Sequence, residues 1–116
     1  MTNNPTDPRA SLEPQASFRR ADGTDETRLE VSGEIDVFTS PSLREELYGV
    51  IDGGASTIVI DCSQMDFIDS SGLGVLVGAL KRIRERGGDF ELQGLNPSTR
   101  KVFEITGLTK LFTIRD

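Results

Sequence analysis

The chain has 116 residues, a formal net charge of −6 and a single cysteine, Cys62, and it contains no histidine. This length corresponds to one domain that buries roughly two thirds of its unfolded surface on folding, and the acidic balance argues against binding a nucleic-acid phosphate backbone, which needs clustered cations. The sequence also lacks the commonest general base and a cysteine pair for zinc, so we expect a protein that is not an enzyme and holds no metal or other cofactor.

The N-terminal segment, residues 1–15, is rich in Pro, Asn, Thr and Ser, which predicts a disordered tail ahead of a domain over residues 16–116. No apolar run approaches the ~20 residues of a membrane span, and the polar N-terminus is unlike a signal peptide. We therefore expect no membrane contact and a cytoplasmic location, where the unpaired Cys62 suits the reducing conditions. Because Cys62 follows a predicted strand, we expect it to be a small, half-buried apolar side chain.

The domain begins with two short segments, 16–19 and 27–32, that alternate apolar and polar residues as half-buried strands do. Turn-forming residues at 21–24 lie between them, so we expect an antiparallel hairpin. Ser40 and Pro41 then predict the start of a helix, with the serine as N-cap and the proline in the first helical position.

The centre of the chain is an apolar run, 57–61, which predicts a buried strand followed by a polar loop of eight residues and a helix. The residues of one helical face are Leu73, Leu76, Val77, Leu80 and Ile83. Asp69 and Ser70 are favourable N-cap types, so the hydroxyls of Ser70 and Ser71 are expected at the positive end of the helix dipole. Added negative charge is tolerated at such a position.

The last third of the chain predicts a strand at 89–93, a third helix starting at Asn96-Pro97, and a short strand at 111–114. The apolar residues of the third helix are Val102, Phe103 and Ile105. The resulting order is β-β-α-β-α-β-α-β. Strand-helix-strand crossovers make neighbouring strands parallel, and the opening hairpin makes the sheet mixed, so we predict an α/β fold whose mixed sheet is covered by helices.

The opposite face of the central helix carries small residues. They are Ser71, Gly74, Val75 and Gly78. Two glycines inside a helix cost roughly 1 kcal/mol each relative to alanine, and close approach of another backbone would offset that cost. The approaching element is either a partner protein or a neighbouring helix of the same domain, and the pattern leaves both possibilities open.

Two other interpretations of the sequence are weaker. The glycines at 72, 74 and 78 resemble a dinucleotide fingerprint, but they lie too far after their strand, and the chain has no Walker P-loop. Four aspartates near predicted strand ends are candidates for a magnesium site of the receiver-domain kind: Asp36, Asp61, Asp66 and Asp69. A receiver has a lysine after its last strand, whereas Lys110 precedes it here, so we prefer capping and solvation for these carboxylates.

Four segments carry a combined signal. They are Gly33-Glu34-Ile35-Asp36, Ser40-Pro41-x-Leu43-Arg44-Glu45-Glu46-Leu47, Phe67-Ile68-Asp69-Ser70-Ser71-Gly72-Leu73-Gly74 and Phe103-Glu104-Ile105-Thr106-Gly107-Leu108. Together they resemble the bacterial anti-sigma factor antagonists, which are stand-alone STAS-domain proteins. The similarity covers residues 16–116 and implies a STAS-like fold.

The resemblance implies a partner switch that regulates transcription, as in the stress response or sporulation. The unphosphorylated protein would bind an anti-sigma factor that is also an ATP-dependent serine kinase, and so free the sigma factor. The kinase would phosphorylate Ser70, the first serine after Asp69, and a PP2C-type phosphatase would restore it. The expected partner-binding residues are Asp36, Asp69, Ser70, Ser71, Gly72, Gly74, Val75 and Gly78.

A second hypothesis belongs to a different functional class. STAS domains have been suspected of nucleotide binding, so the chain could instead have a nucleotide-binding or other regulatory role, or be a small nucleotide-dependent enzyme. The absent P-loop and the absent histidine disfavour this alternative. We therefore expect a phosphorylation-controlled binding protein that contacts neither nucleic acid nor membrane.

Overall fold

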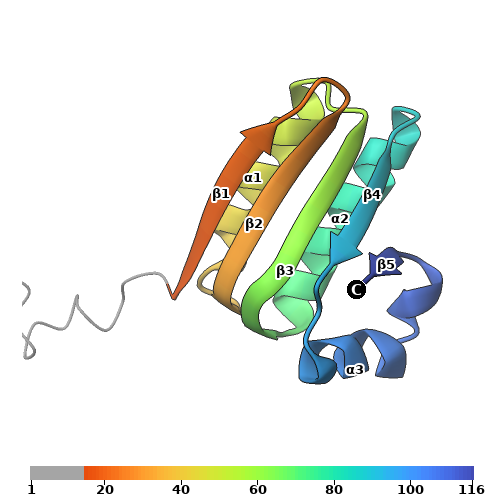
Figure 1. Ribbon diagram of the computed structural model, residues 1–116. Helices are drawn as coiled ribbons and strands as arrows, with labels where there is room; N and C mark the ends of the chain where they lie inside the picture. Colours follow the sequence, from red (N-terminus) through yellow and green to blue (C-terminus); the bar gives the residue numbers. More distant parts are fainter. Residues whose placement is uncertain (1–14) are drawn as a thin grey trace, which may run out of the picture.

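The computed structural model describes residues 15–116, which form one sheet with helices behind it (Figure 1). The strands are β1 (Ala16–Asp22), β2 (Glu26–Ile35), β3 (Thr57–Ile68), β4 (Asp89–Gln93) and β5 (Thr113–Arg115). The helices are α1 (Ser40–Asp52), α2 (Ser70–Glu85) and α3 (Pro97–Ile105), followed by the short 3-10 helix η2 (Leu108–Lys110). This order confirms the predicted one. Except for Gln15, the predicted N-terminal tail lies outside the described residues.

The strands follow one another across the sheet in chain order, β1-β2-β3-β4-β5. β1 pairs antiparallel with β2, and each later pair is parallel, which confirms the predicted hairpin and the mixed sheet. Since β2 and β3 are parallel, their carboxyl ends meet at one edge of the sheet, the lower edge in Figure 1. Helices α1 and α2 begin at this edge.

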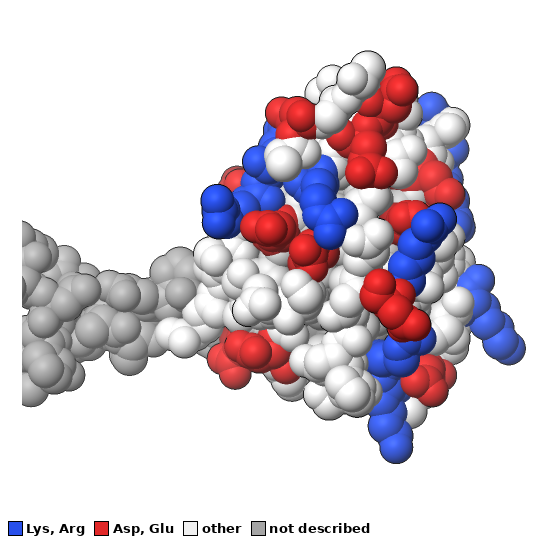
Figure 2. All heavy atoms as spheres, viewed as in Figure 1, with Lys and Arg blue, Asp and Glu red and all other residues white. Residues whose placement is uncertain are grey.

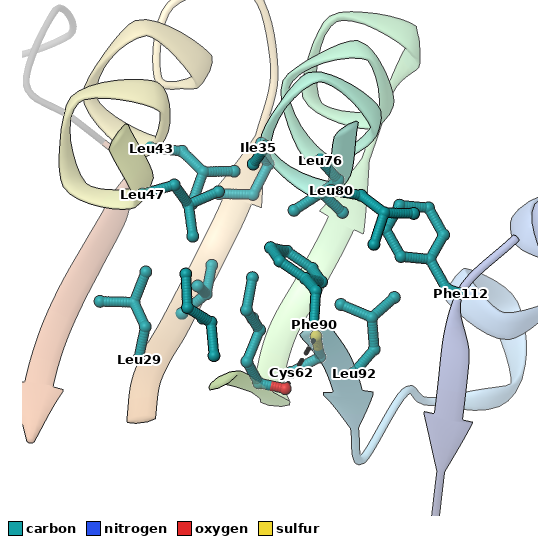
Figure 3. Close-up of a cluster of buried hydrophobic side chains, with 14 of the residues drawn as sticks. Leu29, Ile35, Leu43, Leu47, Cys62, Leu76, Leu80, Phe90, Leu92 and Phe112 are labelled. Atoms are coloured by element: carbon teal, nitrogen blue, oxygen red, sulfur yellow. Dashed lines mark hydrogen bonds between the residues drawn. The ribbon is translucent and has the colours of Figure 1, made fainter. Parts of the chain in front are cut away.

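The core lies between the sheet and the helices α1 and α2 (Figure 3). Leu29, Ile60 and Leu92 are paired across three strands and belong to one buried cluster with Leu47 of α1 and Leu80 of α2. Each of these five side chains is at most 1% exposed, so the helix layer and the sheet exclude water between them.

Cys62 of β3 also faces this core, and it is fully buried rather than half-buried as predicted. The prediction assumed that the strand ends just before Cys62, whereas the strand continues past it. Burial of the sulfur disfavours the thiolate and raises the pKa of the Cys62 thiol to about 12. Its Sγ lies 3.7 Å from the carbonyl oxygen of Ile60 (Figure 3).

Strand β3 is longer than predicted, because the expected polar loop after Asp61 is its second half. This half pairs with β2 up to Ile35, which is opposite Ile68, and the pairing register shifts twice on the way. Register shifts of this kind insert extra residues and break the strict alternation that marks a strand in sequence. Met65 and Ile68 are buried three residues apart, which is why the segment resembled a loop.

Three details of the helices and the last strand also differ from the predictions. Thr39, not Ser40, is the N-cap of α1, so Pro41 occupies the second helical position. Ile105 is 75% exposed and does not join Phe103 in the core. The last strand starts at Thr113 because Phe112 turns inward, where its ring centroid lies 5.8 Å from that of Phe103. No helix in residues 15–116 is long and apolar enough to cross a membrane.

The opposite face of the sheet, here called the open face, has no helix in front of it in the described part of the chain (Figure 1). Arg28 Nη2 lies 3.2 Å from Asp61 Oδ2 and 2.9 Å from Gln93 Oε1. Arg115 Nε lies 2.9 Å from Glu91 Oε1. Figure 2 shows that positive and negative side chains are interspersed over this face. Charges on the open face are therefore largely compensated within it.

Candidate functional site

The junction between β3 and α2 is built around Asp69. Its backbone N–H donates to the carbonyl oxygen of Ile35 at 3.0 Å, which ties the ends of β3 and β2 together. Its carboxylate Oδ1 accepts the N–H of Ser71 at 2.9 Å and that of Gly72 at 3.3 Å, and also the hydroxyl of Ser71. Asp69 is therefore the N-cap of α2, and it satisfies two amides that the helix leaves free.

These hydrogen bonds determine the charge at the start of α2. The hydroxyl of Ser71 in the first place, with the N–H groups of Gly72 and Ser71, holds the pKa of the Asp69 carboxyl below its usual value and outweighs the opposing effect of burial. Asp69 is thus anionic at neutral pH. One negative charge already occupies the positive end of the helix dipole.

The two serines of the motif have different environments. Ser71 is half-buried, and its hydroxyl is engaged by Asp69. Ser70 is exposed, and its hydroxyl makes no hydrogen bond within residues 15–116. Of these two hydroxyls, that of Ser70 is the accessible and unengaged one, and a group attached to it would leave the cap intact.

The three glycines of α2 face different surroundings. A Cβ on Gly72 would lie 2.6 Å from Ile35 Cγ2 and 2.7 Å from Ile68 Cγ1, so this glycine lets the helix start approach β2 and β3 closely. Gly74 is exposed and has open space where a Cβ would be. A Cβ on Gly78 would lie 3.1 Å from the hydroxyl oxygen of Tyr48 on α1. Gly78 thus faces the neighbouring helix, whereas Gly74 is free to face a partner.

Tyr48 closes the seam between α1 and α2. Its ring lies between two guanidinium groups, with Arg44 Cζ at 4.7 Å and Arg82 Cζ at 4.6 Å from the ring centroid. Arg82 is held in turn by Asp52, 3.0 Å away. Val75, which follows Gly74 on α2, is half-buried. The predicted surface of α2 is therefore accessible near Ser70 and Gly74, whereas α1 covers it from Gly78 onward.

The turn between β2 and α1 is organised by Asp36 and Thr39. Asp36 Oδ1 accepts the N–H of Phe38 at 2.9 Å and that of Thr39 at 3.1 Å. The Thr39 hydroxyl donates to the carbonyl oxygen of Glu34 at 2.8 Å and accepts the N–H of Asp36 at 2.9 Å. Asp36 is next in the chain to Ile35, whose carbonyl binds Asp69, so the structure brings the predicted residues Asp36 and Asp69 to the same edge.

Exposed apolar side chains surround this edge, and the sequence analysis missed them. Val37 is 62%, Phe38 83% and Phe67 48% exposed. Only two other large hydrophobic residues in the described part of the chain, Ile105 and Leu111, are exposed. The available signal was the pair Val37-Phe38 between the end of a strand and the start of a proline-led helix. We call Asp36, Val37, Phe38, Phe67, Asp69 and Ser70 the strand-end surface.

The aspartates considered for a magnesium site have separate roles. Asp36 caps the β2–α1 turn, Asp69 caps α2, and Asp61 lies on the open face beside Arg28. Within residues 15–116 no group of three or more carboxylate, thiol or imidazole side chains is close enough to hold a metal ion.

Comparisons with known proteins agree with this architecture. The family model described as the STAS domain matches residues 16–116. The anti-sigma-B factor antagonist of Listeria monocytogenes is 40% identical over 95 residues, which cover 80% of this chain and 82% of that protein. The crystal structure of an anti-sigma factor antagonist from Mycobacterium paratuberculosis has a TM-score of 0.79 and 30% identity, and the match covers 86% of this chain and 85% of that one.

A third relative has been solved in two states. The structures of SpoIIAA, described as an anti-sigma factor antagonist and as a Bacillus cell fate determinant, represent its unphosphorylated and phosphorylated forms, and each is 27% identical to this chain. Their TM-scores are 0.74 and 0.68. Each match covers 84% of this chain, and 87% and 90% of the respective SpoIIAA chain.

Proposed function

The chain belongs to the STAS domain family as an anti-sigma factor antagonist, and we propose that Ser70 is the switch that controls its binding. It is a regulator that acts by binding and not an enzyme. In the proposed cycle the unphosphorylated chain binds an anti-sigma factor that is also a serine kinase, and the sigma factor is released. Phosphorylation of Ser70 ends this binding, and a PP2C-type phosphatase restores it. The cycle uses ATP and a sigma factor, so we place the protein in the cytoplasm.

The observation that carries this proposal is the unequal environment of the two serines. Ser71 donates its hydroxyl to the carboxylate of Asp69 and stabilises the helix start, whereas the hydroxyl of Ser70 is exposed and unengaged. A kinase therefore meets one ready acceptor, and its product leaves the N-cap of α2 intact. A relative that is solved in both unphosphorylated and phosphorylated forms supports phosphorylation as the control.

Charge explains how the phosphate would end binding. A phosphoserine adds about −1.5 to −2 charges at neutral pH, beside an Asp69 that is already anionic. On the free surface this charge stays hydrated. In the complex the phosphate would lie near an acidic or nucleotide-phosphate group of the kinase. One such like-charge pair, ~6 Å apart at an effective dielectric of ~20, costs roughly 3 kcal/mol. That cost corresponds to about a hundredfold loss of affinity.

The docking surface in this proposal includes the predicted residues at and beyond the start of α2. Ser70 and Gly74 are exposed, Ser71 and Val75 are half-exposed, and Asp36 adjoins them at the strand ends, whereas Gly78 faces Tyr48 of α1 and lies at the far border of this surface. Gly72 is buried, so its part is to let the helix start pack against Ile35 and Ile68. We infer that the partner lies over the first turns of α2.

The phosphorylation site can be tested directly. The chain is incubated with ATP and each purified anti-sigma factor of the source cell, and the phosphopeptides are mapped for wild type, Ser70→Ala and Ser71→Ala. We expect phosphate on Ser70 only, none in Ser70→Ala, and retained transfer to Ser71→Ala. Phosphate found mainly on Ser71, or persisting in Ser70→Ala, would overturn the assignment. A PP2C-type phosphatase added afterwards should restore binding.

A further inference from the structure

The strand-end surface exposes an aromatic side chain, Phe38, that does not pack against the core. Phe38 is 83% exposed and follows Val37, which is 62% exposed. Large apolar side chains grouped on the surface of a domain mark interaction sites more often than scattered ones do. Aromatic residues, phenylalanine among them, are also enriched in the buried cores of protein interfaces.

The turn that carries Phe38 is held by several hydrogen bonds. The N–H of Phe38 itself is fixed on Asp36 Oδ1 at 2.9 Å, and the N–H of Ser40 donates to the carbonyl oxygen of Asp36 at 2.8 Å. Thr39 is only 3% exposed, and its hydroxyl joins the carbonyl of Glu34 to the N–H of Asp36. Because the backbone under Phe38 is already ordered, little conformational entropy is lost when its ring is buried by a partner.

The turn also adjoins the proposed phosphorylation site. The hydrogen bond from Asp69 N–H to the Ile35 carbonyl oxygen, 3.0 Å long, fixes the end of β2 beside the residue that precedes Ser70. Phe67 is opposite Glu34 in the same pair of strands and extends the apolar area along β3. Because Ile68 faces the helices, its neighbour Phe67 points to the open face, so a protein that covers Ser70 and the end of β2 meets Phe38 first and reaches Phe67 around the edge of the sheet.

We propose that Phe38 is the apolar anchor of the complex with the anti-sigma factor kinase, that Val37 and Phe67 flank it, and that Asp36 and Thr39 are positioning residues for it. This inference rests on the proposed function and deepens it. The kinase side of the contact is an apolar pocket that receives the Phe38 ring. Phe38 carries no charge, so its contribution to binding is independent of the phosphorylation state of Ser70, which sets release.

The test uses full-length chain and the purified anti-sigma factor kinase. Phe38→Ala is compared with Ile105→Ala, a matched loss of an exposed apolar side chain, 75% accessible, on α3. We expect Phe38→Ala to raise the Kd about 30-fold or more, as loss of an aromatic anchor does, while Ile105→Ala stays within about twofold. Neither variant removes a core contact, so both should melt within about 2 °C of wild type.

The kinase reaction gives a second readout, with the chain as its substrate. Phe38→Ala should raise KM by a factor similar to the rise in Kd and leave kcat unchanged, because the acceptor hydroxyl of Ser70 is untouched. Thr39→Val removes the hydroxyl that holds the turn and should raise KM about tenfold, and Thr39→Ser should restore it. A variant that only destabilised the fold would melt at a lower temperature and would not raise KM selectively at unchanged kcat.

The outcomes separate the two proposals. If wild type binds and Phe38→Ala binds as tightly as Ile105→Ala, the anchor is wrong and the switch at Ser70 stands. A fall in kcat at unchanged KM would also overturn the anchor, since it would place Phe38 in the transfer step. If wild type neither binds nor accepts phosphate from any anti-sigma factor of the source cell, the proposed function and the anchor both fail.

Discussion

Two short segments of this chain, Asp61-Cys62-Ser63 on β3 and Asp69-Ser70-Ser71 at the start of α2, share one local motif. In each, the serine donates its backbone N–H to the aspartate two residues earlier, at 3.0 Å in the first and 2.9 Å in the second. In each, the serine hydroxyl donates to the same carboxylate oxygen and is the main reason that the pKa of the aspartate is lowered. Because both segments have these hydrogen bonds, the bonds alone cannot identify a functional site.

Position in the fold separates the two segments. β3 continues through the first, so its middle residue, Cys62, is buried, and Arg28 lies 3.2 Å from Asp61. The chain turns into a helix at the second, so its middle residue, Ser70, is exposed, and within residues 15–116 no cation forms a salt bridge with Asp69. Compensated charge suits a solvated surface. At the second segment, the free hydroxyl of Ser70 lies next to the unpaired charge of Asp69 and close to exposed aromatic rings. This combination suits a protein contact that phosphorylation of Ser70 can break.

The largest expected effect comes from adding a negative charge at the start of α2, compared with the same charge added at a distant position. Ser70→Asp should weaken binding of the anti-sigma factor at least tenfold, toward the roughly hundredfold loss expected for phosphate, because its charge adds to that of Asp69. Thr24→Asp, in the exposed turn between β1 and β2 at the opposite end of the sheet (Figure 1), should leave affinity within about twofold, because the added charge is far from the contact. The measurement is titration calorimetry. Equal losses would mean that net charge, not position, governs binding.

A smaller effect is expected from replacing the buried and the exposed glycine in the first turns of α2. Gly72→Ala should lower the free energy of unfolding by about 1–3 kcal/mol, because its Cβ would meet Ile35 and Ile68 at under 3 Å. Gly74→Ala has open space and should raise it by up to about 1 kcal/mol through helix propensity. Urea unfolding measures both. A Gly72→Ala variant as stable as wild type would show that the helix start is not fixed by this packing.

The smallest effect concerns pH. The pKa values of Asp61 and Asp69 are lowered in the fold, so the stability that each carboxylate adds is present above about pH 4 and is lost as the pH falls through the folded pKa. Asp61→Asn and Asp69→Asn should each cost under about 1 kcal/mol at pH 7, and Asp61→Asn more, since it leaves Arg28 without its counter-ion.

Urea unfolding at pH 7 and pH 3 checks this prediction. The gap between wild type and each variant should narrow at pH 3, because the aspartates of the unfolded chain, with a pKa of about 3.9, bind protons there more readily than the native ones do. Asp66→Asn is the control, because the Asp66 side chain is exposed and makes no hydrogen bond or ion pair in the described part of the chain. A gap that widens in acid would mean that the aspartates are stabilised in their protonated form.

Much of the fold could be predicted because its signals are local. The leucine stripe of α2, the capping aspartate and the proline-led helix starts at 41 and 97 each depend on neighbouring residues only. The second half of β3 could not be found this way, since its burial depends on a register shift against β2, which lies far away in the chain. Tertiary pairing here overrides a sequence that resembles a loop.

The site was predictable in part for the same reason. Ser70 and Asp69 follow from the motif and its resemblance to a family. The opposite roles of Gly72 and Gly74 do not, because helical spacing cannot say that Ile35, from another strand, lies beneath one of them. Phe38 was missed because an apolar residue in a turn has no periodic partner to mark its orientation. Its exposure appears only once α1 and β3 occupy their places around the turn.

Cys62 gives the molecule a reporter of its own motions. Its sulfur is enclosed between the sheet and the helix layer, and at a pKa of about 12 almost none of it is thiolate at neutral pH. A thiol-reactive reagent can therefore label the native chain only during moments when β3 parts from the helices, so the labelling rate counts those openings. Cys62 is the only cysteine in the sequence, so the labelling rate of the unmodified protein reports core opening without an engineered probe. The rate can be compared between the free protein and its complex with a partner.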